Sequence, residues 1–186
     1  GSEMCIRDSN VLNPANGAPI TVPSQDMVLG LYYITKPRKG VKGEGLTFYG
    51  PEEAIIAYNE KRADLHAQVK CMVSDVDENG NKVRVLKETT IGRILFNQVV
   101  PEEVGYINEV LTKRSLRDII AVVMKKAGAD KVAAFLDDIK AMGYQMAFQG
   151  GLSFNLDAVI IPEEKEKLVQ EGYELSLIHI SEPTRP

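Results

Sequence analysis

The sequence lacks the short motifs by which many self-contained enzymes hold a phosphate, a metal ion or a nucleophile. It has no glycine-rich phosphate loop of either usual spacing, no nucleophile elbow, no HExxH and no cysteine pair at metal-ligand spacing. With two cysteines in 186 residues, it also has no disulfide framework. These absences disfavour an independent small-molecule enzyme, because such an enzyme needs a catalytic constellation.

Long apolar runs and internal repeats are missing as well. The chain contains no run of 18 apolar residues, no credible signal peptide and no repeat. We therefore expect a cytoplasmic protein with no membrane partner. Cys71 lies within an alternating apolar run, so we expect it to be a buried thiol in a reducing compartment.

The two ends of the chain share one nucleotide sequence read on opposite strands. Residues 3–9, back-translated as GAG ATG TGT ATA AGA GAC AG, give a string whose reverse complement encodes residues 175–181. A sequencing adapter joined to both ends of a DNA fragment produces this pattern. We therefore expect residues 1–9 and 175–186 to be adapter-derived tags, and about 10–174 to be an internal slice of a longer protein.

The charge balance is mildly acidic. The net charge is −4, and it becomes −3 without the two ends, which carry three acidic and two basic residues. Such a chain is a poor free-standing nucleic-acid binder, because affinity for phosphates comes largely from clustered Lys and Arg. The exception is the basic tract 36–43, which we interpret as a mobile surface loop; a loop beside polymer phosphates would have the same composition.

The spacing of apolar residues and turn formers predicts an α+β fold: mixed helices and short strands with a β-hairpin and a C-terminal α-hairpin. Helices are predicted at 27–33, 50–61, 115–128, 131–142 or beyond, and from Pro162 onward. Strands are predicted at 46–49, 65–76 and 82–87. The last two strands form a hairpin through the turn 77–81, whose Asn-Gly pair suits positive φ. Residues 115–118 resemble a capping box with aspartate in place of glutamate.

Residues 13–26 combine turn formers, polar amides and a helix start. Prolines at 14, 19 and 23 fix φ, so we expect a stiff, extended path with a turn at Asn16-Gly17. Ser24 or Asp26 is then expected to cap a helix and to leave Gln25 near its positive end. A side chain on so stiff a segment is suited to recognition. The alternative is a helix cap followed by a solvent-facing amide.

Three other features have both a functional and a structural interpretation. In the segment 89–97, Arg93 is a fixed cation in an apolar run, with a buried structural ion pair as the alternative. His66 lies in the predicted strand 65–76 without a partner motif, so we expect a structural role. Asp137 and Asp138 are neighbours on a helix and point about 100° apart, so we expect a solvated face rather than a metal site.

Four motifs follow one another along residues 10–174. They are residues 13–17 with 22–33, residues 42–45, residues 90–97 with Pro101, and residues 153–154 leading to Asp157 and 161–162. Together they resemble the largest catalytic subunit, β′, of bacterial DNA-directed RNA polymerase. The resemblance implies that residues 10–162 form the pore domain, which borders the secondary channel. Residues 163–174 would then begin the helical rim of that channel.

The resemblance also implies a function for the slice. It would line the channel for nucleotide entry in a cytoplasmic nucleotidyltransferase that extends RNA from nucleoside triphosphates on a DNA template. Its partners would be the other polymerase subunits, the remainder of β′, DNA and RNA. The residues expected near the active centre are Ser24, Gln25, Asp26, Asn13 and Asn16. Arg93 is expected to be a cation or an internal clamp.

The same resemblance limits what the slice does alone. The family's aspartate motif, which holds Mg²⁺ in the complete enzyme, is expected upstream of residue 10, so we expect no catalytic residue and no bound metal here. Ala158 stands where relatives commonly have a second acid, and residues 129–142 match the family poorly, so regulatory nucleotide binding is not implied there. The alternative reading is a non-catalytic α+β binding or scaffold domain that shares the motifs.

Overall fold

The computed structural model describes residues 13, 15, 19–77, 80–153 and 155–181, with the backbone alone for 177–181. The chain divides into two units, 1–151 and 152–186, which are described separately. In its described residues the first unit has five helices and a three-stranded sheet. The second has a short 3-10 helix, Leu156–Ala158, and α7, Glu164–Ser181. The predicted α+β class is confirmed.

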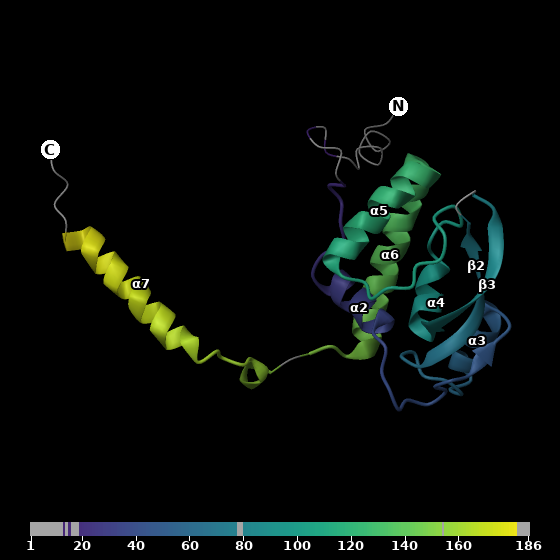
Figure 1. Ribbon diagram of the computed structural model, residues 1–186, viewed down its shortest axis with the longest axis horizontal. Coiled ribbons are helices and arrows are strands. Elements are labelled where there is room, and N and C mark those ends of the chain that lie inside the picture. Colours follow the sequence, from purple (N-terminus) through teal and green to yellow (C-terminus); the bar gives the residue numbers. More distant parts are fainter. Residues whose placement is uncertain (1–12, 14, 16–18, 78–79, 154, 182–186) are drawn as a thin grey trace. The chain divides into compact units, whose positions relative to one another are not determined.

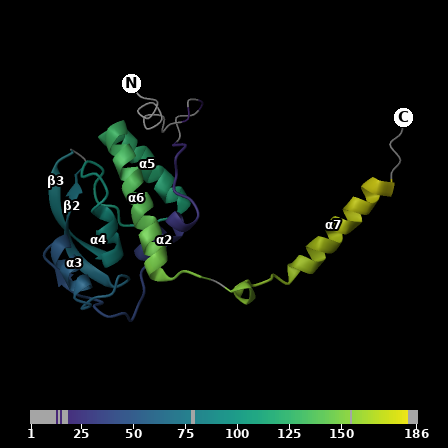
Figure 2. The ribbon, with the colours of Figure 1, turned by 180° about the vertical axis from the view of Figure 1, so that it is seen from behind.

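Three helices form one side of the first unit. They are α2 (Asp26–Thr35), α5 (Lys113–Ala127) and α6 (Ala129–Gly150). Figures 1 and 2 show α5 and α6 side by side, with α2 at one end of the pair. Their buried side chains form one hydrophobic cluster, which includes Leu31, Ile34, Leu116, Ile120, Phe135 and Ile139. The predicted α-hairpin is confirmed: Gly128, at φ 85°, is the single residue between α5 and α6.

A small mixed sheet forms the other side of this unit. Its strands are β1 (Thr47–Phe48), β2 (Gln68–Val76) and β3 (Lys82–Thr90), in the order β1-β2-β3. β1 runs parallel to β2, whereas β2 and β3 pair antiparallel from Gln68 opposite Thr90 to Val76 opposite Lys82. Together with α3 (Pro51–Asn59), the sheet encloses a second cluster that includes Ala54, Ala57, Val69, Cys71 and Val73. The predicted hairpin and the burial of Cys71 are confirmed.

The helix α4 (Ile91–Asn97) joins the two sides. It begins at the residue after β3 ends, with the side chain of Thr90 accepting a hydrogen bond from the Arg93 amide. Ile91 and Ile94 belong to the sheet cluster, whereas Phe96 belongs to the helical cluster. Both views place α4 between the sheet and the helical group (Figures 1 and 2). The side chains of α4 therefore pack in both clusters.

Several predicted bounds were wrong. β2 starts at Gln68 rather than 65, so His66 lies in the turn before the strand, where its amide bonds to the Asp64 carboxylate. β3 continues to Thr90 rather than ending at 87, whereas α6 spans Ala129–Gly150 and so extends beyond 142, as the prediction allowed. Tertiary packing accounts for these extensions, because the added residues pair with β2 or lie against α2.

The two predicted helix caps were also wrong in position. Neither Ser24 nor Asp26 caps α2: Gln25 is the N-cap residue, and no side-chain capping bond is present there. The capping box of α5 is formed by Thr112 and Ser115 rather than by 115–118. The Thr112 hydroxyl accepts the Ser115 amide at 3.2 Å, and the Ser115 hydroxyl accepts the Thr112 amide at 2.7 Å. In the described part of the chain, no helix is both long and apolar enough to cross a membrane.

Candidate functional site

The start of α2 carries the most unusual backbone of the predicted site. Gln25 has φ 51° and ψ −123°, and among the described residues only Lys61 is another non-glycine residue with positive φ. Such a conformation is unfavourable by about 1–3 kcal/mol and persists only when its surroundings impose it. The Gln25 carbonyl accepts the Leu29 amide at 3.0 Å, while its side chain is exposed and does not cap the helix. The side-chain amide of Gln25 is therefore exposed at a helix terminus that it does not cap.

The other predicted residues are only partly brought together. Ser24 is half-buried and its carbonyl accepts the Met27 amide at 3.2 Å, while Asp26 is exposed as the first residue of α2. Both flank Gln25. Asn13 accepts the Ala15 amide on its Oδ1 at 3.0 Å, which forms a local turn. Asn16 and the predicted Asn16-Gly17 turn lie outside the described residues.

Beside Gln25 runs a groove along the exposed face of α2. It has a volume of about 360 Å³ and is lined by Gln25, Val28, Leu29, Tyr32, Leu111, Thr112 and Lys113. Val28, Leu29 and Tyr32 fall on one face of α2, and most of the lining is apolar. Gln25 therefore places a polar amide at the end of a mainly apolar groove.

Glycines hold α2 against α6. A Cβ atom added to Gly30 would lie 2.0 Å from the carbonyl oxygen of Gly143, and one added to Gly143 would lie 2.7 Å from that of Met27. Real Cβ atoms essentially never approach another heavy atom within 3.0 Å. The two helices therefore cross with their backbones in contact, which only glycine at both positions permits.

A third glycine, on α4, brings the backbone of that helix into contact with α2. A Cβ atom on Gly92 would lie 1.8 Å from the carbonyl oxygen of Ile34, in the last turn of α2. Ile34 and Leu31 are fully buried in the helical cluster. The site at the start of α2 therefore rests on a helix whose position is set by backbone contacts on two sides.

Arg93 reaches from α4 to the end of α2. Its Nε donates to the Thr35 carbonyl at 3.1 Å, and its Nη1 donates to the carbonyl and Oδ1 of Asn108 at 3.3 and 3.0 Å. Burial lowers the pKa of Arg93, against the opposing influence of Tyr106 and Glu109. Neutral oxygens rather than a carboxylate receive these bonds, so the guanidinium connects three segments of the chain.

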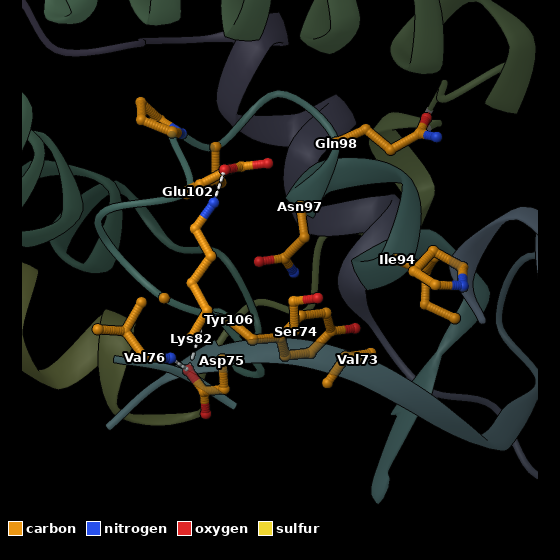
Figure 3. Close-up of a pocket in the computed structure, with 14 residues that line it drawn as sticks. Val73, Ser74, Asp75, Val76, Lys82, Ile94, Asn97, Gln98, Glu102 and Tyr106 are labelled. Atoms are coloured by element: carbon orange, nitrogen blue, oxygen red, sulfur yellow. Dashed lines mark hydrogen bonds and ion pairs between the residues drawn. The ribbon is translucent and has the colours of Figure 1, made fainter. Parts of the chain in front are cut away.

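A separate cavity of about 270 Å³ lies between the hairpin and the loop after α4. Figure 3 shows Lys82 extending from the hairpin to pair with Glu102 on the loop, with Tyr106 and Asn97 on the cavity wall. The Asp75 carboxylate accepts the amides of Val76 and Tyr106 at 2.9 and 3.0 Å.

Most of the polar side chains around this cavity are engaged in hydrogen bonds or ion pairs. Asp75 also pairs with Lys87, while Asn97 donates to the carbonyls of Arg93 and Ile107 at 2.8 and 2.7 Å and accepts the Ile107 amide at 2.8 Å. These bonds fix the loop onto the sheet. We therefore interpret the cavity as part of the scaffold rather than as a reaction site.

The basic tract is anchored on the turn that contains His66. The Nδ1 atom of His66 bonds to the Lys36 carbonyl at 2.9 Å, and the backbone carbonyl of His66 accepts the Arg38 amide at 3.1 Å. The ring packs edge-on against Tyr33, and its buried Nε2 has no hydrogen-bond partner among the described residues. Lys36 and Arg38 are exposed. The contacts of His66 are those of a structural residue, as we expected.

The adjacent acids on α6 do not form a ligand set. Asp137 and Asp138 are exposed, and Asp137 pairs with Lys140 at 2.7 Å on the same helix. The described residues contain no group of three or more His, Cys, Asp or Glu side chains that could hold a metal ion. The solvated face predicted for this pair is confirmed.

The geometry thus consists of a strained, exposed glutamine on a rigidly held helix within an α+β scaffold. The chain matches the family model for RNA polymerase Rpb1, domain 3, over residues 10–159. It therefore belongs to that family.

Curated relatives show which member proteins are similar. The chain is 67% identical over 171 residues to the DNA-directed RNA polymerase subunit beta' of Bacteroides fragilis, and 66% identical over 171 residues to that of Bacteroides thetaiotaomicron. It is 53% identical over 176 residues to the same subunit of Flavobacterium johnsoniae. Each match covers 92% of this chain and 12% of the relative. The chain thus spans about an eighth of the length of these relatives.

Sequence reasoning missed the residues that hold α2 in place. Gly143, Thr35 and Asn108 lie outside the four motifs, and Gly30 lies inside one without a predicted role, because their partners lie on other elements far along the chain. The one available signal was the presence of glycine inside two predicted helices, where it is unfavourable unless close packing requires it.

Proposed function

We propose that this chain is part of a β′ subunit of DNA-directed RNA polymerase and lines the secondary channel beside the active centre. In the assembled enzyme, with its other subunits, a DNA template and RNA, it shapes the path by which nucleoside triphosphates enter. The match to the family over residues 10–159 and the names of the relatives support this proposal.

The backbone of Gln25 carries the assignment of the site. A residue that keeps an unfavourable φ of 51° while exposing its amide group is typical of a position selected for contact rather than for packing. An amide both donates and accepts hydrogen bonds, so it suits the hydroxyl and carbonyl groups of an incoming nucleotide or of the RNA end. Ser24 and Asp26 offer further polar groups on either side.

The role of the chain's residues is positional. The complete enzyme would hold Mg²⁺, which supplies charge stabilisation for nucleotidyl transfer. The described residues do not fit this ion, because they offer no cluster of three or more His, Cys, Asp or Glu side chains. We therefore propose that they bind and orient the nucleotide or the RNA end and do not hold the ion.

Photocrosslinking tests whether Gln25 faces the active centre. A benzophenone amino acid replaces Gln25 in the complete subunit, the polymerase is assembled on a template with radiolabelled RNA, and the complex is irradiated. We expect crosslinks to the RNA 3′ end or to a labelled nucleotide.

The matched control carries the same group at Tyr49, an aromatic position that is 91% exposed and lies at the sheet rather than on α2. It should give no crosslink to the RNA end or to the nucleotide. Equal labelling from both positions, or none from position 25 in an active enzyme, would contradict the proposed location.

A further inference from the structure

The end of α2 is stabilised by a cation that comes from another element. α2 has no basic residue in its last turn. The Arg93 Nε instead donates to the Thr35 carbonyl at 3.1 Å. The last carbonyls of a helix lack partners within the helix and form the negative end of its dipole. Arg93 therefore adds a hydrogen bond and a charge at the Thr35 carbonyl, next to the C-cap residue Lys36.

Thr35 and Asn108 extend this contact into a junction. The buried Thr35 hydroxyl donates to the Leu31 carbonyl at 2.8 Å and accepts the Leu111 amide at 3.0 Å. Asn108, which receives two bonds from Arg93, donates from its Nδ2 to the Glu88 carbonyl at 2.8 Å. The end of α2, the helix α4, the strand β3 and the loop before α5 thus meet at Arg93.

The glycine crossing makes the two ends of α2 move together. Gly30 lies five residues from both Gln25 and Thr35, and it touches the Gly143 backbone of α6. A rigid helix of 10 residues is about 15 Å long. The contact with α6 spans Met27 to Gly30, so if the helix tilts about it, a displacement at Thr35 produces a smaller one, in the opposite direction, at Gln25.

We propose that Arg93 is a positioning residue for nucleotide addition: by clamping the end of α2, it sets the orientation of Gln25 at the other end of the helix. This inference rests on the proposed function. The planar guanidinium is required because one side chain must bond to Thr35 and Asn108 at once, which a lysine ammonium on a flexible stem does not reproduce.

A double-mutant comparison in the complete polymerase tests this coupling. Single-nucleotide addition is measured by rapid quench for wild type, Gln25→Ala, Arg93→Gln and the double variant, across nucleotide concentrations. We expect Arg93→Gln to lower the maximal rate by roughly 10-fold or more, because small misplacements of catalytic geometry have effects of this size. In the Gln25→Ala background, the same change should lower the rate less than about 2-fold.

Two further variants separate positioning from folding. Arg117→Gln removes an exposed arginine of α5 and should leave the rate unchanged. Asn108→Ser removes the Oδ1 acceptor together with the Nδ2 bond to Glu88, and it leaves Arg93 on the carbonyls of Thr35 and residue 108. It gives the same comparison if the Arg93 variants fail to assemble. We expect Asn108→Ser to lower the rate of nucleotide addition by less than Arg93→Gln does, and to have no effect in the Gln25→Ala background.

The outcomes distinguish this inference from the proposed function. Wild-type rates for Gln25→Ala would contradict the role proposed for Gln25, and the coupling with it. A slow Gln25→Ala enzyme together with a normal Arg93→Gln enzyme, or the same fold-loss in both backgrounds, would overturn the coupling alone. If neither the Arg93 variants nor Asn108→Ser assemble, Arg93 is a folding residue and the inference is wrong.

Discussion

The crossing of α2 and α6 at Gly30 predicts a large loss of stability from a single added methyl group. In Gly30→Ala, the new Cβ would lie 2.0 Å from the Gly143 carbonyl oxygen and 2.9 Å from the Ala147 amide nitrogen. Both atoms belong to the backbone of a helix, so neither moves away by a change of rotamer. Reaching the shortest separation that real Cβ atoms show, 3.0 Å, requires the helices to part by about 1 Å.

The expected magnitude follows from what that separation disrupts. Leu31 and Ile34 are fully buried on α2, and Phe135 and Ile139 are buried on α6. A gap of 0.5–1 Å already forfeits a quarter to a half of the dispersion energy of the contacting atoms. We therefore expect a loss of about 3–5 kcal/mol, comparable to that of a cavity-forming core substitution. The gain in helix propensity from glycine to alanine offsets only about 1 kcal/mol of it.

Urea denaturation of the chain, followed by circular dichroism at 222 nm, measures this loss. With a urea dependence of about 2 kcal/mol per molar, the midpoint should fall by roughly 1.5–2.5 M. Gly172→Ala is the matched control, since it replaces a helical glycine that has no neighbour within 4 Å. It should not lower the midpoint. A fall of less than about 0.5 M for Gly30→Ala would refute the proposed backbone contact.

Two further predictions concern the sheet. Burial of Asp75 acts to raise its pKa, but hydrogen bonds from Lys87, Tyr106 and Val76 outweigh burial and lower the pKa from its ordinary 3.8. The ionised carboxylate therefore stabilises the fold above pH 3.8, and this contribution is lost as the pH falls through the lowered pKa. Asp75→Asn should therefore lower the free energy of unfolding by about 1–3 kcal/mol at pH 7, with a difference from wild type that shrinks below pH 3.8; an equal difference at both pH values in urea titrations would contradict this. Burial, with a smaller effect of the Glu53 charge, raises the pKa of Cys71 to about 11. In a chain that carries Cys5→Ser, a disulfide reagent at pH 8 should therefore label folded Cys71 at least about 100-fold more slowly than Cys71 in the chain unfolded in urea. Similar rates in folded and unfolded chains would show that the thiol is accessible.

The sequence predicted local structure well because the deciding signals are local. Proline and acids at 51–53 start α3, and alternating residues with a turn at 77–81 form the hairpin. The caps of α2 and α5 were misplaced by up to three residues, because several neighbouring polar residues are acceptable caps and only the folded backbone decides between them.

The geometry of the candidate site was not predictable from the sequence. Residues 24–26 were singled out through their proline-framed segment and their resemblance to a family, and their role stays a prediction. The positive φ of Gln25 was not foreseen, since it is imposed by the path of the chain rather than by residue type. The role of Arg93 was left open between cation and clamp, because its acceptors, Thr35 and Asn108, lie 58 and 15 residues away in sequence.

The distance along the chain between α2 and α6 has a consequence for synthesis on the ribosome. All buried members of the sheet cluster lie between Phe48 and Ile94, so this cluster is complete early. The contact partner of α2 begins only at Ala129, 94 residues after Thr35, which takes roughly 5–20 s to synthesise at bacterial rates. During that interval, Leu31 and Ile34 have no α6 to cover them. The first helix of the described chain is therefore among the last to be buried. We expect a nascent chain paused before Ala129 to expose these apolar side chains and to bind chaperones.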